Sequence, residues 1–248
     1  MTRTHSVRLA TEADFDRIVD VVVEAFLRDP VYNYFGSLKE FIPKDRDSQE
    51  KEHRKRWAQF LLKLCVLGGG RVTVLVEHGE TSPEEESERI VGVAEWLPPN
   101  KRVALWRVRT MVKAGIIVML RAWGLPGLLR CGFEWMDSTE QTMLKAFQKR
   151  NLGKPEATWH LLQIAVLPEC QGKGYMSKLF REAFDHAPDA IFTLEATTAG
   201  SRDKYAHIGF EGIGVVTLGK GKSDTDGFKA KGESAVGVDA YPMVKLVK

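Results

Sequence analysis

The stretch from Trp159 to His186, WHLLQIAVLPECQGKGYMSKLFREAFDH, constrains the fold more than any other part of this chain. Its first nine residues are mostly apolar and rich in branched side chains, which is typical of a buried strand. Pro168 ends that strand, because proline has no N–H to donate to a sheet ladder. Apolar residues then recur at helical spacing, at Met176, Leu179, Phe180, Ala183 and Phe184. The stretch therefore predicts a strand, a short turn and a helix.

The turn between this strand and this helix, Gln171 to Gly174, is suited to an anion. The first N–H groups of a helix have no partners within the helix, and the helix dipole adds positive charge there. Gly172 and Gly174 allow the backbone to approach an oxyanion closely, and Lys173 can add a full charge. A diphosphate fits this geometry, and an ordinary tight turn is the alternative. Ser177 stands where the dinucleotide fingerprint has its third glycine, and no Walker A motif occurs.

The segment V-L-P-E-C-Q-G-K-G-Y-M resembles the coenzyme A loop of the GNAT superfamily of N-acetyltransferases. Four residues match the family pattern, namely Val166, Pro168, Gln171 and Gly174. Met176 departs from it, because the family usually has Gly or Ala there. A second segment, from Tyr205 to Phe210, resembles the Tyr-x-x-x-Gly-Phe element of the family's last helix. The resemblance covers residues 157 to 216.

This resemblance implies an α/β fold with a central mixed, mostly antiparallel sheet of about seven strands. The sheet is expected to be splayed between its fourth and fifth strands and flanked by helices. Residues 100–150 are helical in composition, and we interpret them as an insertion like that of larger relatives, including the puromycin N-acetyltransferase type. Breaks are expected at Gly124 to Gly127 and at Cys131-Gly132, and one strand is expected over 210–218. Without an interdomain linker, residues 1–248 are predicted to form a single domain.

Composition limits the partners of this chain of 248 residues. A net charge of +3 is too weak to indicate nucleic acid, although it suits an anionic cosubstrate. The three cysteines have no metal-binding spacing and fit a reducing compartment. The N-terminal residues lack the apolar core of a signal peptide, and the apolar run from Ala114 to Leu120 is too short to span a bilayer. We expect a cytoplasmic protein with no metal, nucleic acid or membrane partner. Contact of the insertion with a membrane surface is the alternative, and a homodimer is left open.

The resemblance also implies an activity. A GNAT enzyme uses acetyl-CoA as cosubstrate and transfers the acetyl group by direct attack in a ternary complex. The acceptor expected here is a primary amine of a small molecule. Two alternatives stay open: an acyltransferase for another acyl chain or a peptide amine, and an acyl-CoA-binding protein with a regulatory role. The aromatic segment from Val31 to Phe35 either covers the acceptor pocket, as in the family, or packs under the sheet.

The cosubstrate-binding residues follow from the same resemblance. Backbone groups on the strand, where the family's strand bulges, are expected to hold the pantetheine arm and to offer an N–H to an oxyanion. Backbone groups of the turn are expected to hold the diphosphate. Thr198 stands near a position where the family often has an asparagine that contacts the cofactor. The full set is Ile164, Ala165, Val166, Gln171, Gly172, Lys173, Gly174, Tyr175, Met176, Ser177 and Thr198.

The catalytic candidates are Tyr205, Glu95 and Glu195. Tyr205 is expected to be the general acid, because a phenol with a reference pKa of about 10 stays protonated beside a thiolate with a reference pKa of about 8.5. A packed helix aromatic is its alternative role. Carboxylates within apolar strands usually face a functional site or a salt bridge, which makes Glu95 and Glu195 candidates for the base. His160, Gln163 and a water relay stay open as further candidates for that role.

Overall fold

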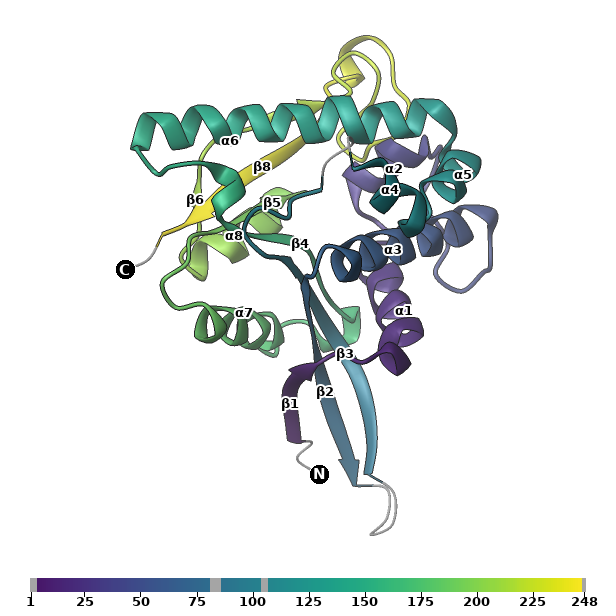
Figure 1. Ribbon diagram of the computed structural model, residues 1–248. Helices are drawn as coiled ribbons and strands as arrows, with labels where there is room; N and C mark the ends of the chain where they lie inside the picture. The colour runs from purple at the N-terminus through teal and green to yellow at the C-terminus, as the bar shows by residue number, and fades with distance from the viewer. Residues whose placement is uncertain (1–3, 81–85, 104–106, 247–248) are drawn as a thin grey trace.

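The computed structural model describes residues 4–80, 86–103 and 107–246, which form a mixed α/β fold around one large sheet (Figure 1). Among these residues the sheet has eight strands in the order β1-β2-β3-β4-β5-β8-β6, with β7 pairing to β8. Apart from the parallel pair β4–β5, these described neighbours are antiparallel, as predicted. The strands are β1 (Thr4–Leu9), β2 (Arg71–Glu80), β3 (Glu86–Leu97), β4 (Trp159–Val166), β5 (Phe192–Ala196), β6 (Glu211–Gly212), β7 (Val216–Leu218) and β8 (Val238–Lys245).

The sheet has one strand more than the sequence predicts, because residues 210–218 form two short strands instead of one. These strands are β6 and β7, and both pair with β8. The chain leaves the ladder after Ile213, whose amide still donates to Pro242 O of β8. A continuous apolar pattern across 210–218 therefore does not show where the strand is interrupted.

The predicted splay lies between β4 and β5 and is confirmed. The two strands pair in parallel at only two positions, Trp159 with Phe192 and His160 with Thr193. Beyond His160 they diverge, and no described strand pairs with that edge of β4. The remaining length of β4, Leu161 to Val166, keeps its antiparallel partner β3 on the other edge only.

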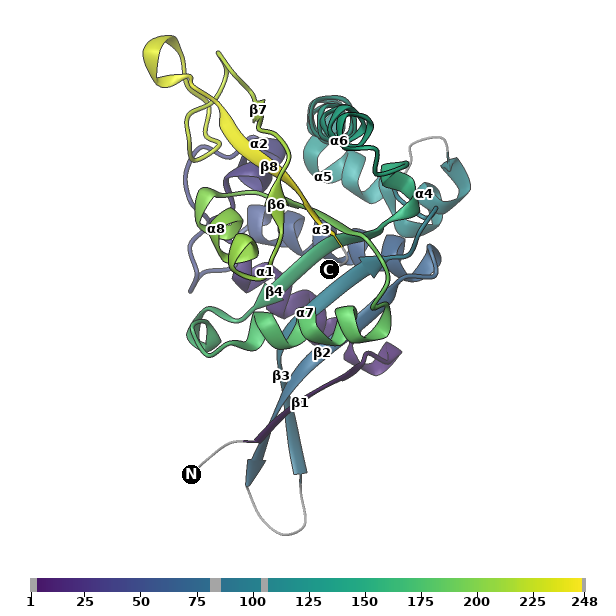
Figure 2. The same cartoon turned by 90° about the vertical axis from the view of Figure 1, so that its left-hand side faces the viewer.

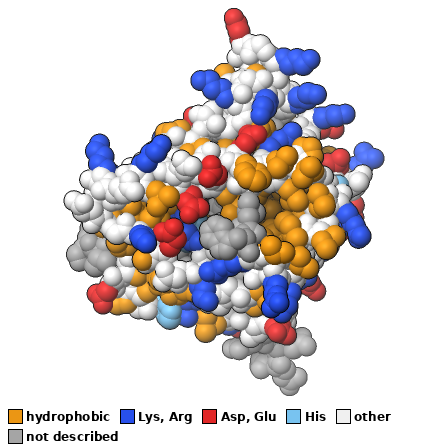
Figure 3. Space-filling view, turned by 45° about the horizontal axis from the view of Figure 1, so that its top comes forward, with side chains coloured by type: hydrophobic (Ala, Val, Ile, Leu, Met, Phe, Trp, Pro, Cys, Tyr) orange, Lys and Arg blue, Asp and Glu red, His pale blue; other side chains and the backbone are white. Residues whose placement is uncertain are grey.

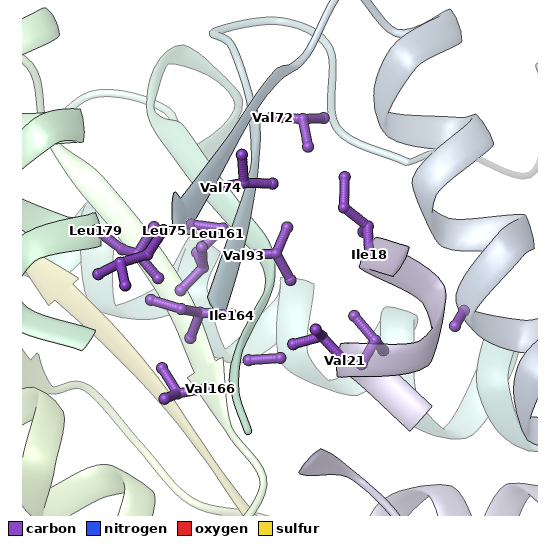
Figure 4. Close-up of a cluster of buried hydrophobic side chains, with 14 of the residues drawn as sticks. Ile18, Val21, Val72, Val74, Leu75, Val93, Leu161, Ile164, Val166 and Leu179 are labelled. Carbon is purple, nitrogen blue, oxygen red and sulfur yellow. The ribbon is translucent and has the colours of Figure 1, made fainter. Parts of the chain in front are cut away.

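Helices cover both faces of the sheet (Figure 2). On one face lie α1 (Phe15–Ala25) and α3 (Gln49–Leu67), with α2 (Pro30–Gly36) beyond them, and on the other lies α7 (Tyr175–His186). The helix α8 (Ala199–His207) packs beside β5 and β8. In Figure 4, Ile18 of α1 points towards Val93, while Leu75 and Leu179 lie on the opposite side of β2 from Val74. Adjacent strand residues such as Val74 and Leu75 face opposite layers because side chains alternate along a strand.

The predicted helical insertion lies between β3 and β4. It consists of α4 (Val108–Ala114), α5 (Ile116–Leu129), a π-helical segment (Arg130–Met136) and α6 (Asp137–Arg150). The predicted break at Gly124 is confirmed by a kink in α5, where Gly124 has φ 66° and ψ −179°. The predicted break at Cys131-Gly132 is wrong, because the helix continues through a π turn. A glycine costs a helix only about 1 kcal/mol relative to alanine, and packing overrides that cost.

The insertion builds a second apolar core against α2 and α3, centred on Phe35, Trp57, Phe60, Met111 and Met119. From Ile116 to Arg150 the helices run on for 35 residues, which by length and composition is apolar enough to cross a bilayer. The run is longer than the seven-residue apolar stretch considered in the sequence, and 17% of its most apolar window is buried. Length and composition alone do not establish a span, so the absence of a membrane partner stays a prediction.

Candidate active site

A cavity of about 790 Å³ lies where β4 and β5 diverge. One end is lined by β4, by the turn before α7 and by α8, and the other end by α2, α3 and the insertion. Many of the sequence-predicted site residues line it: Ile164, Ala165, Val166, Gln171, Gly172, Gly174, Tyr175, Met176, Ser177, Glu195, Thr198 and Tyr205. The splay therefore opens into a space that side chains leave unfilled.

The turn before α7 presents backbone N–H groups to this space. The amides of Gly172, Lys173, Gly174, Met176 and Ser177 donate no hydrogen bond to any described residue. Gly172 and Gly174 have φ values of 79° and 76°, in the left-handed region that favours glycine. A Cβ added at either position would meet no atom within 4 Å, so the space above the turn is open. Unbonded amides at a helix N-terminus beside open space are the features of an anion site.

The side chain of Lys173 was predicted to add its charge to the anion site, but in the structure it lies outside the cavity. The Lys173 Nζ lies 3.7 Å from Glu77 Oε1 and over the Tyr175 ring, and Lys173 does not line the cavity. The charge of Lys173 therefore lies beside the turn and outside the cavity. Gln171 Nε2 donates to Val166 O at 3.2 Å, which ties the turn to the end of β4. Met176 lines the cavity together with these glycines, so its side chain adds an apolar surface without closing the space.

The strand bulge lies earlier than the sequence comparison with the family predicts. The register of β3 with β4 shifts between Glu95↔Gln163 and Trp96↔Leu161, which leaves Leu162 as the extra residue. The bulge is thus at Leu162, and Ile164 to Val166 lie just beyond it with regular pairing to β3. Their unpaired edge faces the cavity and can bind an extended chain as a further strand would.

Glu195 is the carboxylate that the splay exposes to the cavity. Its Oε2 lies 3.4 Å from His160 Nε2, and both side chains are about nine-tenths buried. Burial raises the pKa of Glu195 to about 7; Arg102 opposes this rise and Glu140 adds to it. A carboxylate with a pKa near neutrality can accept and release a proton under physiological conditions.

His160 is neutral in this arrangement, because burial and the neighbouring Arg102 hold its pKa well below the usual range. Arg102 Nη2 lies 3.1 Å from His160 Nδ1 and donates to Thr193 Oγ1 at 2.8 Å. A guanidinium can only donate, so Nδ1 is the accepting nitrogen and Nε2 carries the hydrogen. The Nε2–H group of His160 faces the Glu195 carboxylate and orients that carboxylate beside the cavity.

Glu95, the other predicted base, lies outside the residues that line the cavity. It is fully buried, and Gln163 Nε2 donates to its Oε1 at 2.6 Å. Burial raises the pKa of Glu95 to about 8, with the Gln163 hydrogen bond acting in the opposite direction. Gln163 lines the cavity and separates Glu95 from it. Of the two carboxylates, Glu195 is the one that a ligand in the cavity can reach.

Tyr205 lines the same cavity from α8. Its ring packs against Phe180 and Phe210, at centroid distances of 5.7 and 6.3 Å. Burial raises the pKa of Tyr205, and the charge of Asp29 adds to the effect. Its hydroxyl therefore stays protonated at any physiological pH and can donate a hydrogen bond. The packing role and the acid role predicted for Tyr205 are compatible in this position.

Asp29 lines the cavity, although no functional role was predicted for it from the sequence. Its Oδ1 accepts from the Tyr32 amide at 2.9 Å as the N-cap of α2, and its Oδ2 accepts from the Thr197 hydroxyl. Burial raises the pKa of Asp29, and its hydrogen bonds and Arg54 limit the rise. In the sequence, Asp29-Pro30 predicts only a helix boundary. The same residue pattern does not indicate whether the Asp29 side chain also faces a cavity.

Comparisons with known proteins match the part of the chain that contains much of this site. The model of the acetyltransferase (GNAT) family matches residues 134–210, which include β4, the turn, α7, β5 and α8. An uncharacterized N-acetyltransferase of Schizosaccharomyces pombe is 22% identical over 200 residues, covering 79% of this chain and 70% of the relative. Residues 134–210 of this chain therefore match the GNAT family of acetyltransferases, and the relative that spans most of the chain is an N-acetyltransferase. The family match covers both segments on which the resemblance in the sequence depends.

Solved structures share the GNAT fold over nearly the whole chain. A histone acetyltransferase HPA2 and related acetyltransferase from Corynebacterium glutamicum has a TM-score of 0.60 at 20% identity, covering 100% of this chain and 98% of that one. Arylalkylamine N-acetyltransferase 2 from Aedes aegypti has a TM-score of 0.56 at 12% identity, covering 99% and 100%. The likeness to the puromycin N-acetyltransferase type stays a prediction. GNAT acetyltransferases generally use acetyl-CoA, and the unbonded amides and the open edge of β4 fit that cosubstrate.

Proposed function

We propose that this GNAT acetyltransferase moves the acetyl group of acetyl-CoA to the primary amine of a small molecule, by direct attack in a ternary complex. One observation supports the proposal. A single cavity is lined by a turn with unbonded amides, an open strand edge and a carboxylate whose pKa is about 7. Donor and acceptor can therefore occupy the two ends of one space at the same time.

The turn and β4 would hold the cosubstrate. The amides from Gly172 to Ser177 would bind the diphosphate, with Gln171 fixing the turn to Val166. The edge of Ile164 to Val166 would hydrogen-bond the pantetheine arm, and Thr198, the N-cap of α8, lines the same end of the cavity. Bound acetyl-CoA supplies the thioester carbonyl that the amine attacks. A β4 amide beyond the bulge at Leu162 would donate to the oxygen of that carbonyl.

Glu195 would take the proton from the amine. An alkylammonium, like lysine, has a reference pKa of about 10, and only the neutral amine is a nucleophile. A carboxylate of pKa about 7 is a stronger base than an ordinary glutamate, and the neutral His160, which Arg102 contacts on its other nitrogen, holds it in one orientation. Tyr205 would donate a hydrogen bond to the departing sulfur. Unpaired thiols at all three cysteines support a cytoplasmic location for this activity.

Two measurements on the full chain test the proposal. Isothermal titration calorimetry should show binding of acetyl-CoA and of CoA, and a thiol-release assay should show turnover with small primary amines. Binding without turnover on any amine or peptide N-terminus would instead indicate an acyl-CoA-binding regulator. Turnover confined to peptides would indicate a peptide acyltransferase. Absence of binding would exclude all thioester chemistry at this site.

A further inference from the structure

The end of the cavity away from the turn is walled by apolar side chains. We call this end the insertion chamber, and we define it by the cavity-lining residues of α3, α4, α5 and the π segment. Every described residue that these elements contribute to the cavity is apolar. They are Trp57, Phe60, Leu61, Leu64, Met111, Ile116, Leu125, Leu128, Leu129, Cys131, Gly132, Phe133, Trp135 and Met136.

The charged groups and the histidine that line the cavity come from other elements. The described ones are Arg28, Asp29, Arg102, Glu140, His160, Glu195 and Lys204. Glu195 and His160 lie on β5 and β4 at the splay, and Asp29 is bonded to Thr197 just after β5. The carboxylates Asp29 and Glu195 can therefore meet an ammonium group at the splay, whereas the residues that α3, α4, α5 and the π segment contribute to the cavity offer it no charged partner.

Aromatic contacts fix the shape of the insertion chamber. The Trp57 ring lies 5.9 Å from Tyr32, 6.1 Å from Phe35 and 5.6 Å from Phe60, between centroids. The Phe35 ring also lies 6.0 Å from Trp135, which joins α2 to the π segment. Rings packed in this way form a preformed apolar wall, the kind of surface that binds an aryl or alkyl group without reorganisation.

We propose that the acceptor is a primary amine that carries a large apolar group, aryl or long alkyl, and that this group fills the insertion chamber. The inference rests on the proposed function, since it places the amine beside Glu195. A linear polyamine of similar length would have to bury its distal ammonium against walls that offer no carboxylate, and contact with aromatic rings only partly offsets this cost. A monoamine with an apolar tail meets no such cost and gains from the burial of its tail.

Apolar side chains also line the opening of the insertion chamber. Leu125, Leu129 and Phe133 line the cavity and are also 61%, 44% and 63% exposed, so they reach from its wall to the surface. Figure 3, which views the molecule with the top of Figure 1 brought forward, shows hydrophobic side chains gathered on one side of that face. An apolar tail would thus contact apolar side chains from the surface to the chamber.

The experiment compares acceptors by kcat/KM, using the full chain, saturating acetyl-CoA and thiol release. The acceptors are n-alkylamines from butylamine to decylamine, phenylalkylamines, and a linear triamine as long as decylamine. Burial of one methylene favours binding by about fourfold, so kcat/KM should rise by roughly that factor per carbon until the chamber is filled. The triamine should be at least about 100-fold poorer than decylamine. A flat series, or a preference for the triamine, would overturn the proposal.

A matched pair of variants tests whether the apolar tail of the amine lies in the insertion chamber. Leu128→Trp places an indole ring in the chamber, and Val118→Trp places the same ring at an exposed position of α5 that does not line the cavity. Leu128→Trp should lower the decylamine-to-butylamine ratio of kcat/KM by tenfold or more, while Val118→Trp should keep the wild-type ratio. Equal ratios in the two variants, with both folded by thermal melting, would place the tail elsewhere.

Binding separates a failure of this inference from a failure of the proposed function. If no amine is acetylated, the proposed function fails, and calorimetry of the CoA-bound protein with decylamine, butylamine and the triamine decides the inference. Tight binding of decylamine alone would support an insertion chamber for lipophilic amines in a protein without transferase activity. Absence of binding, or tighter binding of the triamine, would refute it.

Discussion

If Glu195 is the base, the activity should follow its ionisation. With a pKa of about 7, Glu195 is about half ionised at pH 7, about 9% ionised at pH 6 and about 1% ionised at pH 5. The value of kcat, measured with saturating acetyl-CoA and an amine of pKa above 10, should therefore fall about fivefold from pH 7 to pH 6 and about 50-fold to pH 5. A glutamate at its ordinary value of 4.5 would stay mostly ionised over this range, and kcat would barely change.

Two substitutions identify the group whose protonation causes this fall of kcat at low pH, the acid limb of the pH profile. Glu195→Gln keeps the shape and should lower kcat at pH 8 by 10²- to 10⁴-fold, the usual contribution of a general base, and should remove the limb. Glu140→Gln removes a negative charge that raises the pKa of Glu195. The limb should then move to lower pH with little loss at pH 8. Together the variants assign the limb to the carboxylate at the splay.

The assay is stopped-flow or steady-state thiol release from pH 5 to 9, with circular dichroism at each pH to show that the protein stays folded. A limb that persists unchanged in Glu195→Gln would refute Glu195 as the base. A limb that moves upward in Glu140→Gln would refute the electrostatic account, because removal of a neighbouring negative charge can only favour ionisation.

Three further predictions concern other parts of the site. Tyr205→Phe should lower kcat about 10- to 100-fold and leave the Kd of CoA within about twofold by calorimetry; an unchanged kcat would leave Tyr205 a packing residue only. Gly174→Val should weaken CoA binding at least tenfold, whereas Gly153→Val, at a similar φ of 80° with no Cβ contact, should only destabilise the fold; equal CoA affinities would contradict an anion site at the turn. The folded pKa of Glu95, about 8, exceeds its unfolded value of 4.5, so its ionisation removes stability as pH rises from 4.5 to 8. Glu95→Gln should therefore stabilise the protein by roughly 3 to 5 kcal/mol at pH 8 and by under about 1 kcal/mol at pH 5 in urea unfolding; a pH-independent effect would refute burial of the charge.

The strand, the turn and α7 were predictable because local chemistry determines each of them. Pro168 ends the ladder, Gly172 and Gly174 tolerate the left-handed conformation, and the apolar spacing after Gly174 defines one helix face. These are statements about neighbouring residues, and the structure confirms them. The same holds for the kink at Gly124, where glycine adopts a conformation that other residues avoid.

Features that depend on distant pairing were not predictable in this way. The bulge at Leu162 results from the register between β3 and β4, whose paired residues are more than 60 positions apart. The continuity of the helix through Cys131 depends on packing of the π segment against α2 and α5. Asp29 reads as a helix cap in the sequence, and only the fold brings it to Thr197, 168 residues later.

Glu95 and Glu195 show most clearly what a sequence can and cannot separate. Each is a carboxylate within an apolar strand, and burial raises the pKa of both. Glu95 lies opposite Gln163, next to the bulge at Leu162, and β3 pairs with β4 on both sides of that bulge, so the ladder encloses Glu95. Glu195 lies three residues beyond Phe192, past the last pair of β5 with β4, so the divergence of the strands opens the cavity beside it. The position at which β4 and β5 separate therefore decides which carboxylate is accessible. That position cannot be predicted from the residue type, because both residues are glutamates within apolar strands.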